Sequence, residues 1–265
     1  MNKFTNTITI LIMLSFSSVL YAETMDIWFS PGWKTKPQAA KSISSALEKD
    51  SGVKIKPRIA KSYPQMLDAM ASSKPSLVYV GSFVQAIIHA RGTGTGLVQA
   101  ANGKELYSGV LIYKKGGDPE SILKNHPSNV AFAVGASSGE STAKAATSGQ
   151  AAFKTRNHKA TAGAVKAGKA KAGVVKNWWW KANGSKYPDL AMYEIPNISV
   201  TKNPDNVLSA SNSVSSATRV KIKQAAVKNK DVFKAKNMVD FDKSKLDFTL
   251  SLMKKGKIDP MTYSW

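Results

Sequence analysis

The sequence predicts an α/β protein of two compact lobes, each with a mostly parallel sheet flanked by helices. Three observations lead to this prediction. After residue 22, short strand-like runs alternate with helical stretches, which is typical of parallel sheets covered by helices. No repeat occurs at the roughly 20 to 50 residue periods of solenoids. No long low-complexity linker interrupts the 265 residues. We therefore expect two lobes joined by short crossings.

Several apolar runs have the length of strands. Val53–Ile59 alternates apolar and basic residues, as a half-buried strand does. The expected strands are Met25–Phe29, Val53–Ile59, Leu77–Val80, Leu106–Tyr113, Val130–Val134, Ala172–Val175 and Leu190–Ile195.

Helical spacing and terminal residues indicate the helices between these strands. Pro37 suits the first turn of a helix whose apolar face continues to Leu47, and Gly52 ends it. Ser30–Lys36 and Gly92–Gly96 are expected to be loops. The expected helices start at Pro37 and Pro64 and then cover Phe83–Arg91, Ser141–Phe153, Thr161–Ala167, Ser215–Lys228 and Ser244–Lys255.

The composition excludes several chemistries. The chain has no cysteine, so it has no disulfide framework, zinc–cysteine site or cysteine nucleophile. Its three histidines, His89, His126 and His158, form no helical metal-binding pair. We expect neither a metal nor a cofactor.

The first residues have the pattern of a signal peptide. Lys3 supplies a positive start, and the apolar stretch Ile8–Leu20 is too short, and too polar at its end, to span a bilayer. We expect cleavage after Ala22, so that residues 1–22 are removed and the mature protein lies in the periplasm.

The net charge of +21 comes almost entirely from lysine. Only four of the 38 basic residues are arginines, and the lysines are dispersed rather than grouped in blocks. Lysine is a hydrated point charge, whereas proteins that read nucleic acid usually gather their charge and interleave aromatic residues. We expect no specific nucleic-acid partner. The excess indicates a solvated surface, or an anionic ligand, polymer or membrane face.

The clearest local pattern is the strand Val130–Val134, followed by the small-residue turn Gly135–Gly139 and a helix. Such a helix start directs backbone N–H groups and serine hydroxyls at one point, which suits an anion. Ordinary capping by serine and glycine explains the same residues equally well.

The turn also spells the G-x-S-x-G nucleophile elbow of α/β-hydrolases, with Ser137 as the nucleophile. The only histidine after it is His158, and the sole acid between them, Glu140, lies one helical turn from the serine. That acid cannot stand behind a histidine on another loop, which disfavours the triad. We expect no enzymatic activity.

Three segments resemble the periplasmic phosphonate, phosphite and phosphate-binding proteins of ABC importers. Ile59–Met70 with Leu77–Ser82 is similar to that family's first lobe, in which a tyrosine begins a helix and a strand ends in a glycine turn. Ser137–Gly139 resembles its phosphate loop, and Asn157–Gly173 its histidine-bearing segment. The matches run in order from about residue 25 to 230.

The resemblance implies a type II periplasmic-binding-protein fold and a set of ligand contacts. It implies that Tyr63, Ser137, Ser138 and His158 face the ligand. Ser82 and Gln85 stand where the family often has a proline and a tyrosine, and we include both in the expected site. Lys171 and Ser76 occupy regions where the family often has acids. The absence of acids at these two positions would weaken the binding of a ligand that carries an aminoalkyl ammonium group.

Other placements stay open for the aromatic residues and the histidine. Tyr63 could pack on the core, and His158 could be an exposed loop residue. Trp33, on the loop after the first strand, is placed as cleft residues are in open parallel sheets. The run Trp178–Trp180 cannot face one way throughout, so at least one ring is expected to pack inside.

We therefore expect a monomeric solute-binding protein whose lobes are residues 23–108 with 197–265, and residues 109–196. Crossings near Tyr107 and Pro196 are the expected hinges. The expected partners are a small ligand, most simply a phosphate- or phosphonate-like oxyanion, and an ABC permease in the membrane. The alternatives are the same fold with a different cargo, or a lysine-rich module for anionic polymers or membrane surfaces, whose binding would collapse with salt.

Overall fold

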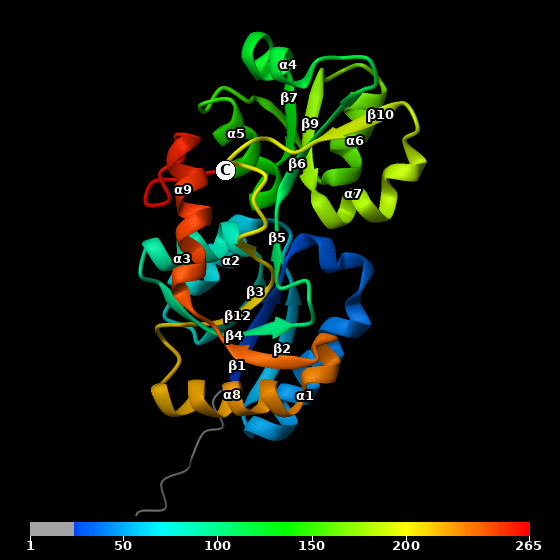
Figure 1. Ribbon diagram of the computed structural model, residues 1–265. Helices are drawn as coiled ribbons and strands as arrows, with labels where there is room; N and C mark the ends of the chain where they lie inside the picture. Colours follow the sequence, from blue (N-terminus) through cyan, green and yellow to red (C-terminus); the bar gives the residue numbers. More distant parts are fainter. Residues whose placement is uncertain (1–23) are drawn as a thin grey trace, which may run out of the picture.

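The structure is a computed structural model that describes residues 24–265, so the expected signal peptide at residues 1–22 lies outside the described residues. Two β-sheets form the centres of two lobes, one above the other in Figure 1. The chain builds most of the first lobe, crosses to the second, and then returns to the first sheet. The expected class, a two-lobed α/β protein, is confirmed.

The first lobe contains a six-stranded sheet in the order β13-β4-β12-β3-β1-β2. Its strands are β1 (Thr24–Phe29), β2 (Lys54–Ile59), β3 (Ser76–Val80), β4 (Gly94–Ala101), β12 (Val207–Ser211) and β13 (Asn237–Asp240). Helices α1 (Pro37–Ser51) and α8 (Ser216–Lys228) cover one face, and α2 (Tyr63–Ala71) and α3 (Ser82–Ala90) the other. Alternation along β3 supplies both cores: Leu77 packs with the first pair of helices, and Val78 with the second.

The second lobe contains a five-stranded sheet in the order β10-β6-β9-β7-β8. Its strands are β6 (Gly109–Lys114), β7 (Val130–Ala133), β8 (Phe153–Thr155), β9 (Ala172–Lys176) and β10 (Leu190–Tyr193). Helices α6 (His158–Lys166) and α7 (Asn177–Asn183) pack on one face, and α4 (Pro119–Asn125) and α5 (Thr142–Ala146) on the other. Each sheet is therefore buried on both faces.

Both sheets are mixed, with more antiparallel pairing than we expected. Strand β1 pairs in parallel with β2 and β3, and β7 in parallel with β8 and β9. Strands β12 and β13 pair antiparallel with their neighbours, as do β6 and β10. β12 enters the first sheet from the second lobe, and α8 crosses over from β12 to β13, so these two strands run in the same direction and opposite to β3 and β4.

Helix α1 shows how well the terminal residues predict an element. It begins at Pro37, buries Ala40, Ile43 and Leu47 against the sheet, and ends at Gly52 with φ +71°. A left-handed residue at this position suits glycine, because glycine has no Cβ to clash with the backbone. The expected start and end of this helix are confirmed.

One expected helix and one expected loop were wrong. The helix expected over Ser141–Phe153 ends at Ala146, because the chain turns through Ser148 and Gly149 with positive φ before β8 begins. The expected loop Gly92–Gly96 contains the start of β4, where a Cβ on Gly94 would lie 2.6 Å from the carbonyl oxygen of Ala210 on the neighbouring strand. Glycine marks a close backbone approach here rather than a loop.

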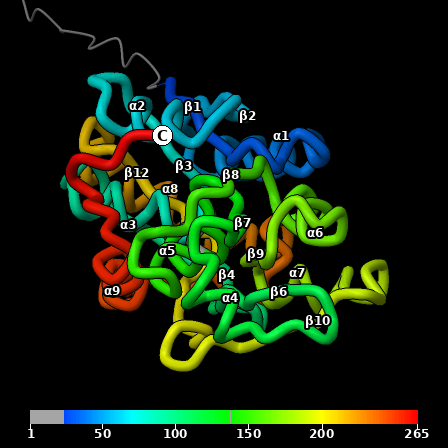
Figure 2. Tube along the Cα trace, turned by 90° about the horizontal axis from the view of Figure 1, so that it is seen from above, coloured from blue at the N-terminus to red at the C-terminus, as the bar shows by residue number. Residues whose placement is uncertain are grey.

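The lobes are joined by a short two-stranded sheet and by the C-terminal segment. β5 (Leu106–Tyr107) pairs antiparallel with β11 (Asn203–Pro204) between the two large sheets. The strand expected over Leu106–Tyr113 is thus divided, because its two parts join different sheets. Helix α9 (Asp247–Lys255) runs alongside both lobes (Figure 1) and packs against α3 and α5 (Figure 2). Within residues 24–265, no helix combines the length and the apolar character needed to cross a bilayer.

Candidate functional site

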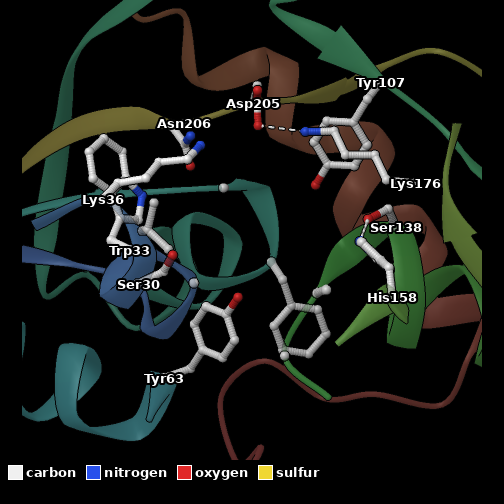
Figure 3. Close-up of a pocket in the computed structure, with 16 residues that line it drawn as sticks. Ser30, Trp33, Lys36, Tyr63, Tyr107, Ser138, His158, Lys176, Asp205 and Asn206 are labelled. Atoms are coloured by element: carbon white, nitrogen blue, oxygen red, sulfur yellow. Dashed lines mark hydrogen bonds and ion pairs between the residues drawn. The ribbon is translucent and has the colours of Figure 1, made fainter. Parts of the chain in front are cut away.

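A cavity of about 380 Å³ opens between the lobes (Figure 3). The first lobe lines it with residues after β1, at the start of α2 and after β3, and the second lobe with residues after β7, at the start of α6 and at the end of β9. Ligands of open α/β sheets bind at these carboxyl ends of strands. The lining residues are Ser30, Gly32, Trp33, Lys36, Tyr63, Val80, Gly81, Phe83, Tyr107, Gly135, Ala136, Ser138, His158, Lys176, Asp205 and Asn206.

The turn after β7 is held by one buried carboxylate. Gly135 donates its amide to Glu140 Oε2 at 2.8 Å, and Tyr263 donates its hydroxyl to Glu140 Oε1 at 2.7 Å. Lys144 lies 3.3 Å from the same carboxylate, which is almost fully buried. The Gly135 amide is therefore occupied by the protein itself. In place of the regular helix start that we expected, Ser137–Ser141 form a π-helical turn, a feature common at functional sites.

Aromatic rings pack behind this turn. Gly135 has φ +74°, and a Cβ there would overlap the rings of Trp265 and Tyr63. These two rings stack on each other with centroids 5.5 Å apart. Trp265 also packs against Phe83, 5.6 Å away between centroids. The C-terminal segment thus supports residues of both lobes at one end of the cavity.

His158 and Ser138 face each other in the cavity. The hydroxyl oxygen of Ser138 lies 3.3 Å from His158 Nε2. Burial and the nearby positive charge of Lys176 lower the pKa of His158 to about 4. The imidazole is therefore neutral at pH 7, with one nitrogen that donates and one that accepts. Its Nδ1 is buried and has no hydrogen-bond partner among residues 24–265.

An ion pair near Ser138 joins the second lobe to the segment that returns to the first lobe. Lys176 Nζ, at the end of β9, lies 2.8 Å from Asp205 Oδ1, in the segment that returns to the first lobe. The same ammonium group lies 4.1 Å from the ring centroid of Tyr107 and 4.6 Å from that of Trp178. Lys36 adds a second positive charge to the lining. Cations therefore outnumber carboxylates in the cavity.

Four of the expected site residues line the cavity, namely Trp33, Tyr63, Ser138 and His158. Figure 3 shows the Tyr63 hydroxyl directed into it. Burial raises the pKa of Tyr63, so the hydroxyl keeps its proton. Trp33 packs on Phe29, 4.7 Å away between ring centroids, and so joins the cavity to the first core.

Three expected site residues are placed differently. Ser82 is buried one layer behind the lining, where its hydroxyl lies 2.8 Å from that of Tyr107. Gln85 lies inside the first lobe, where it donates to Val207 O at 3.0 Å and accepts from Ser209 Oγ at 2.7 Å. It holds β12 in place and is not part of the lining. Ser137 begins the π-helical turn, and its side chain lies outside what the structure describes.

The sequence reasoning missed Lys36, Tyr107, Lys176, Asp205 and Asn206, all of which line the cavity. Lys176 could have been found, because it ends a buried strand, where ligand contacts are expected in this kind of sheet. Asp205 had no comparable pattern, since it follows a strand of only two residues.

A cavity between two lobes, lined from the strand ends of both, defines a two-lobed solute-binding protein. The chain belongs to the family described as ABC transporter, phosphonate, periplasmic substrate-binding protein, which matches residues 37–246. The family is one of transport proteins rather than enzymes and acts outside the cytoplasm. A comparison with curated protein sequences finds no match.

Solved structures share the fold at low sequence identity. PhnD1 from Prochlorococcus marinus (MIT 9301), in complex with methylphosphonate, is 15% identical, with a TM-score of 0.67 over 88% of this chain and 98% of that chain. A binding-protein component of an ABC phosphonate transporter from Pseudomonas aeruginosa is 14% identical, with a TM-score of 0.68 over 89% of this chain and 87% of that chain. A Xanthomonas citri protein bound to ATP is 11% identical, with a TM-score of 0.67 over 88% of this chain and 97% of that chain.

Proposed function

We propose that the protein captures a small oxyanion of the phosphate or phosphonate type between its lobes and delivers it to an ABC permease. The observation that carries this proposal is the neutral His158 beside Ser138, facing the protonated Tyr63 across a cavity with two lysines. The structure of PhnD1 with methylphosphonate supports the choice of cargo.

The ligand is held by hydrogen bonds from both lobes. The hydroxyls of Tyr63 and Ser138 donate to its oxygens, together with a ring nitrogen of His158. The amides of Ser137 and Ser138 serve as further donors, because the Gly135 amide is already bonded to Glu140. Lys36 and Lys176 supply the positive charge. Hydrogen bonds to a charged group are stronger than those between neutral groups.

The lobes close on the ligand about the crossing strands. We place the lobes at residues 23–108 with 197–265 and at 109–196, with hinges near Tyr107 and Pro196. Closure excludes water from the cavity, which strengthens each dipole–anion contact by lowering the local dielectric. The closed form, as a monomer in the periplasm, is the form that the permease recognises.

Calorimetry and mass spectrometry test the cargo. Ligand released by gently denaturing freshly purified protein is identified by mass, and phosphate, phosphite and methylphosphonate are then titrated into the emptied protein. We expect saturable binding of at least one of them, with tryptophan fluorescence changing in parallel. Ser138→Ala should weaken it at least tenfold, while Ser42→Ala, on the exposed side of α1, should not. Unchanged fluorescence and melting temperature with all three anions would reject the proposal.

A second candidate function is supported by the charge distribution in the second lobe. Residues 141–188 contain ten basic residues and no acid. Exposed Lys154, Arg156 and Lys169 border a surface groove between β8 and α6. Such a surface suits an anionic polymer or membrane face.

If binding to such a surface is the main activity, retention of the protein on heparin or on phosphatidylglycerol vesicles should fall steeply between 50 and 200 mM salt, roughly the range over which polyanion binding collapses. Binding of a small anion inside the cavity should change much less.

A further inference from the structure

The cavity holds one carboxylate, Asp205, and that carboxylate is already neutralised by a lysine. We propose that Lys176 makes the site select oxyanions without a cationic substituent and reject those that carry an ammonium group. This inference rests on the proposed function, because it concerns the second part of a ligand whose oxyanion binds near Ser138.

The ion pair lies where a substituent on the oxyanion would extend. Figure 3 shows Lys176 and Asp205 facing each other beside Ser138 and His158, on the same wall of the cavity. Lys176, which belongs to the second lobe, pairs with this carboxylate through a 2.8 Å contact between its Nζ and Asp205 Oδ1. About a fifth of the lysine side chain and a third of the aspartate remain exposed. The pair is therefore accessible to a ligand.

Lys176 is fixed by its neighbours. The rings of Tyr107 and Trp178 lie 4.1 and 4.6 Å from its ammonium group, which is the range of cation–π attraction. The Tyr107 ring is buried, and its hydroxyl lies 2.8 Å from that of Ser82. Ser82 thereby positions Tyr107, and Tyr107 positions Lys176. Moving the lysine aside would lose the ion pair and both ring contacts.

A ligand ammonium group would therefore meet an unfavourable field. It would have to compete with Lys176 for Asp205, and it would lie near the like charges of Lys176 and Lys36. His158 is neutral and offers no compensating negative charge. A methyl or ethyl group carries no such penalty, because it leaves the ion pair intact.

The test compares two ligands that differ only in a terminal ammonium group. Ethylphosphonate and 2-aminoethylphosphonate are titrated into the wild-type protein by calorimetry at low salt. We expect ethylphosphonate to bind at least tenfold more tightly. Lys176→Glu places a second carboxylate beside Asp205, and we expect it to reverse this preference or to reduce it at least tenfold. Lys176→Met, which frees Asp205 without adding a charge, should give an intermediate ratio.

Lys181→Glu is the matched control, because it changes the same charge on the exposed side of α7. It should leave the ratio of the two affinities unchanged, and thermal melts check that all variants are folded. Equal binding of the two ligands by the wild type, or an unchanged ratio in Lys176→Glu, would overturn the inference while the proposed function stands. If the wild type binds neither compound, nor phosphate, phosphite or methylphosphonate, the proposed function itself fails, and this inference with it.

Discussion

Removal of the Glu140 carboxylate should destabilise the protein strongly, because one buried group holds three partners. Glu140→Ala leaves the Gly135 amide and the Tyr263 hydroxyl without their acceptor, and Lys144 without its counter-charge. Removing one member of a buried charged network costs about 3–5 kcal/mol. With a urea m-value of about 1–3 kcal/mol/M, the unfolding midpoint should fall by at least about 1 M.

The assay is urea unfolding followed by tryptophan fluorescence, with Glu194→Ala as the control. Glu194 is exposed, so its replacement should change the stability by less than about 0.5 kcal/mol. Because Glu140 also fixes the turn that carries Ser138, methylphosphonate affinity should fall in Glu140→Ala at temperatures where the variant is folded. A midpoint shift no larger than that of Glu194→Ala would refute the idea that this carboxylate holds the turn.

Three other changes test the packing and the protonation of buried groups. Gln85→Ala should lower the free energy of unfolding by about 1–3 kcal/mol, because two buried hydrogen bonds are lost. Methylphosphonate affinity should stay within twofold of the wild type. A loss of affinity above fivefold would place Gln85 in the site. Gly135→Ala should lower the free energy of unfolding by about 1–3 kcal/mol more than Gly116→Ala does, because both glycines have positive φ but only Gly135 faces aromatic rings. Equal losses of stability in denaturant titrations would contradict this packing. In the folded protein the pKa of His158 is about 4, below the ordinary value of 6.5, so His158 is mostly neutral at pH 7 in the folded and the unfolded protein. As the pH falls below 6.5, the unfolded protein binds a proton at this residue and the folded protein does not, which favours unfolding. Stability should therefore drop by about 2 kcal/mol between pH 7 and 5. His158→Asn should reduce this loss, while His126→Asn, at an exposed position, should not; identical pH profiles for the two variants would contradict the buried, neutral His158.

The sequence predicted the fold class and the elements with clear terminal residues. The helix from Pro37 to the residue before Gly52 appeared as expected, because a proline start, an apolar face and a left-handed glycine act locally. Strands β4, β12 and β13 were missed, because their place in the sheet depends on partners far along the chain. Ser209 in β12, for example, is fixed by Gln85, 124 residues earlier.

The candidate site was predicted in part for the same reason. Tyr63, Ser138 and His158 stand at element starts or in a recognisable turn, so local patterns and family resemblance pointed to them. Lys176 and Asp205 are 29 residues apart and belong to different lobes, so only the three-dimensional arrangement shows that they pair. The role of Trp265 could not be predicted from a local pattern either, because it depends on contacts with Tyr63 and Phe83, which lie far away in the sequence.

The C-terminal segment constrains how the two lobes can separate. Arg91, just after α3 in the first lobe, donates to the carbonyl oxygens of Pro260 at 3.0 Å and Tyr263 at 2.7 Å. In the second lobe, Glu140 accepts the Tyr263 hydroxyl. Two hydrogen bonds and the packing of Trp265 on Phe83 join this segment to the first lobe, while α9 and Gly256 pack on α5 of the second lobe. The bond between Tyr263 and Glu140 is therefore one of the contacts that hold the lobes together through this segment. Tyr263→Phe should shift the protein towards the open form, which small-angle X-ray scattering without ligand would detect as a larger radius of gyration. An unchanged radius would show that this bond does not resist opening.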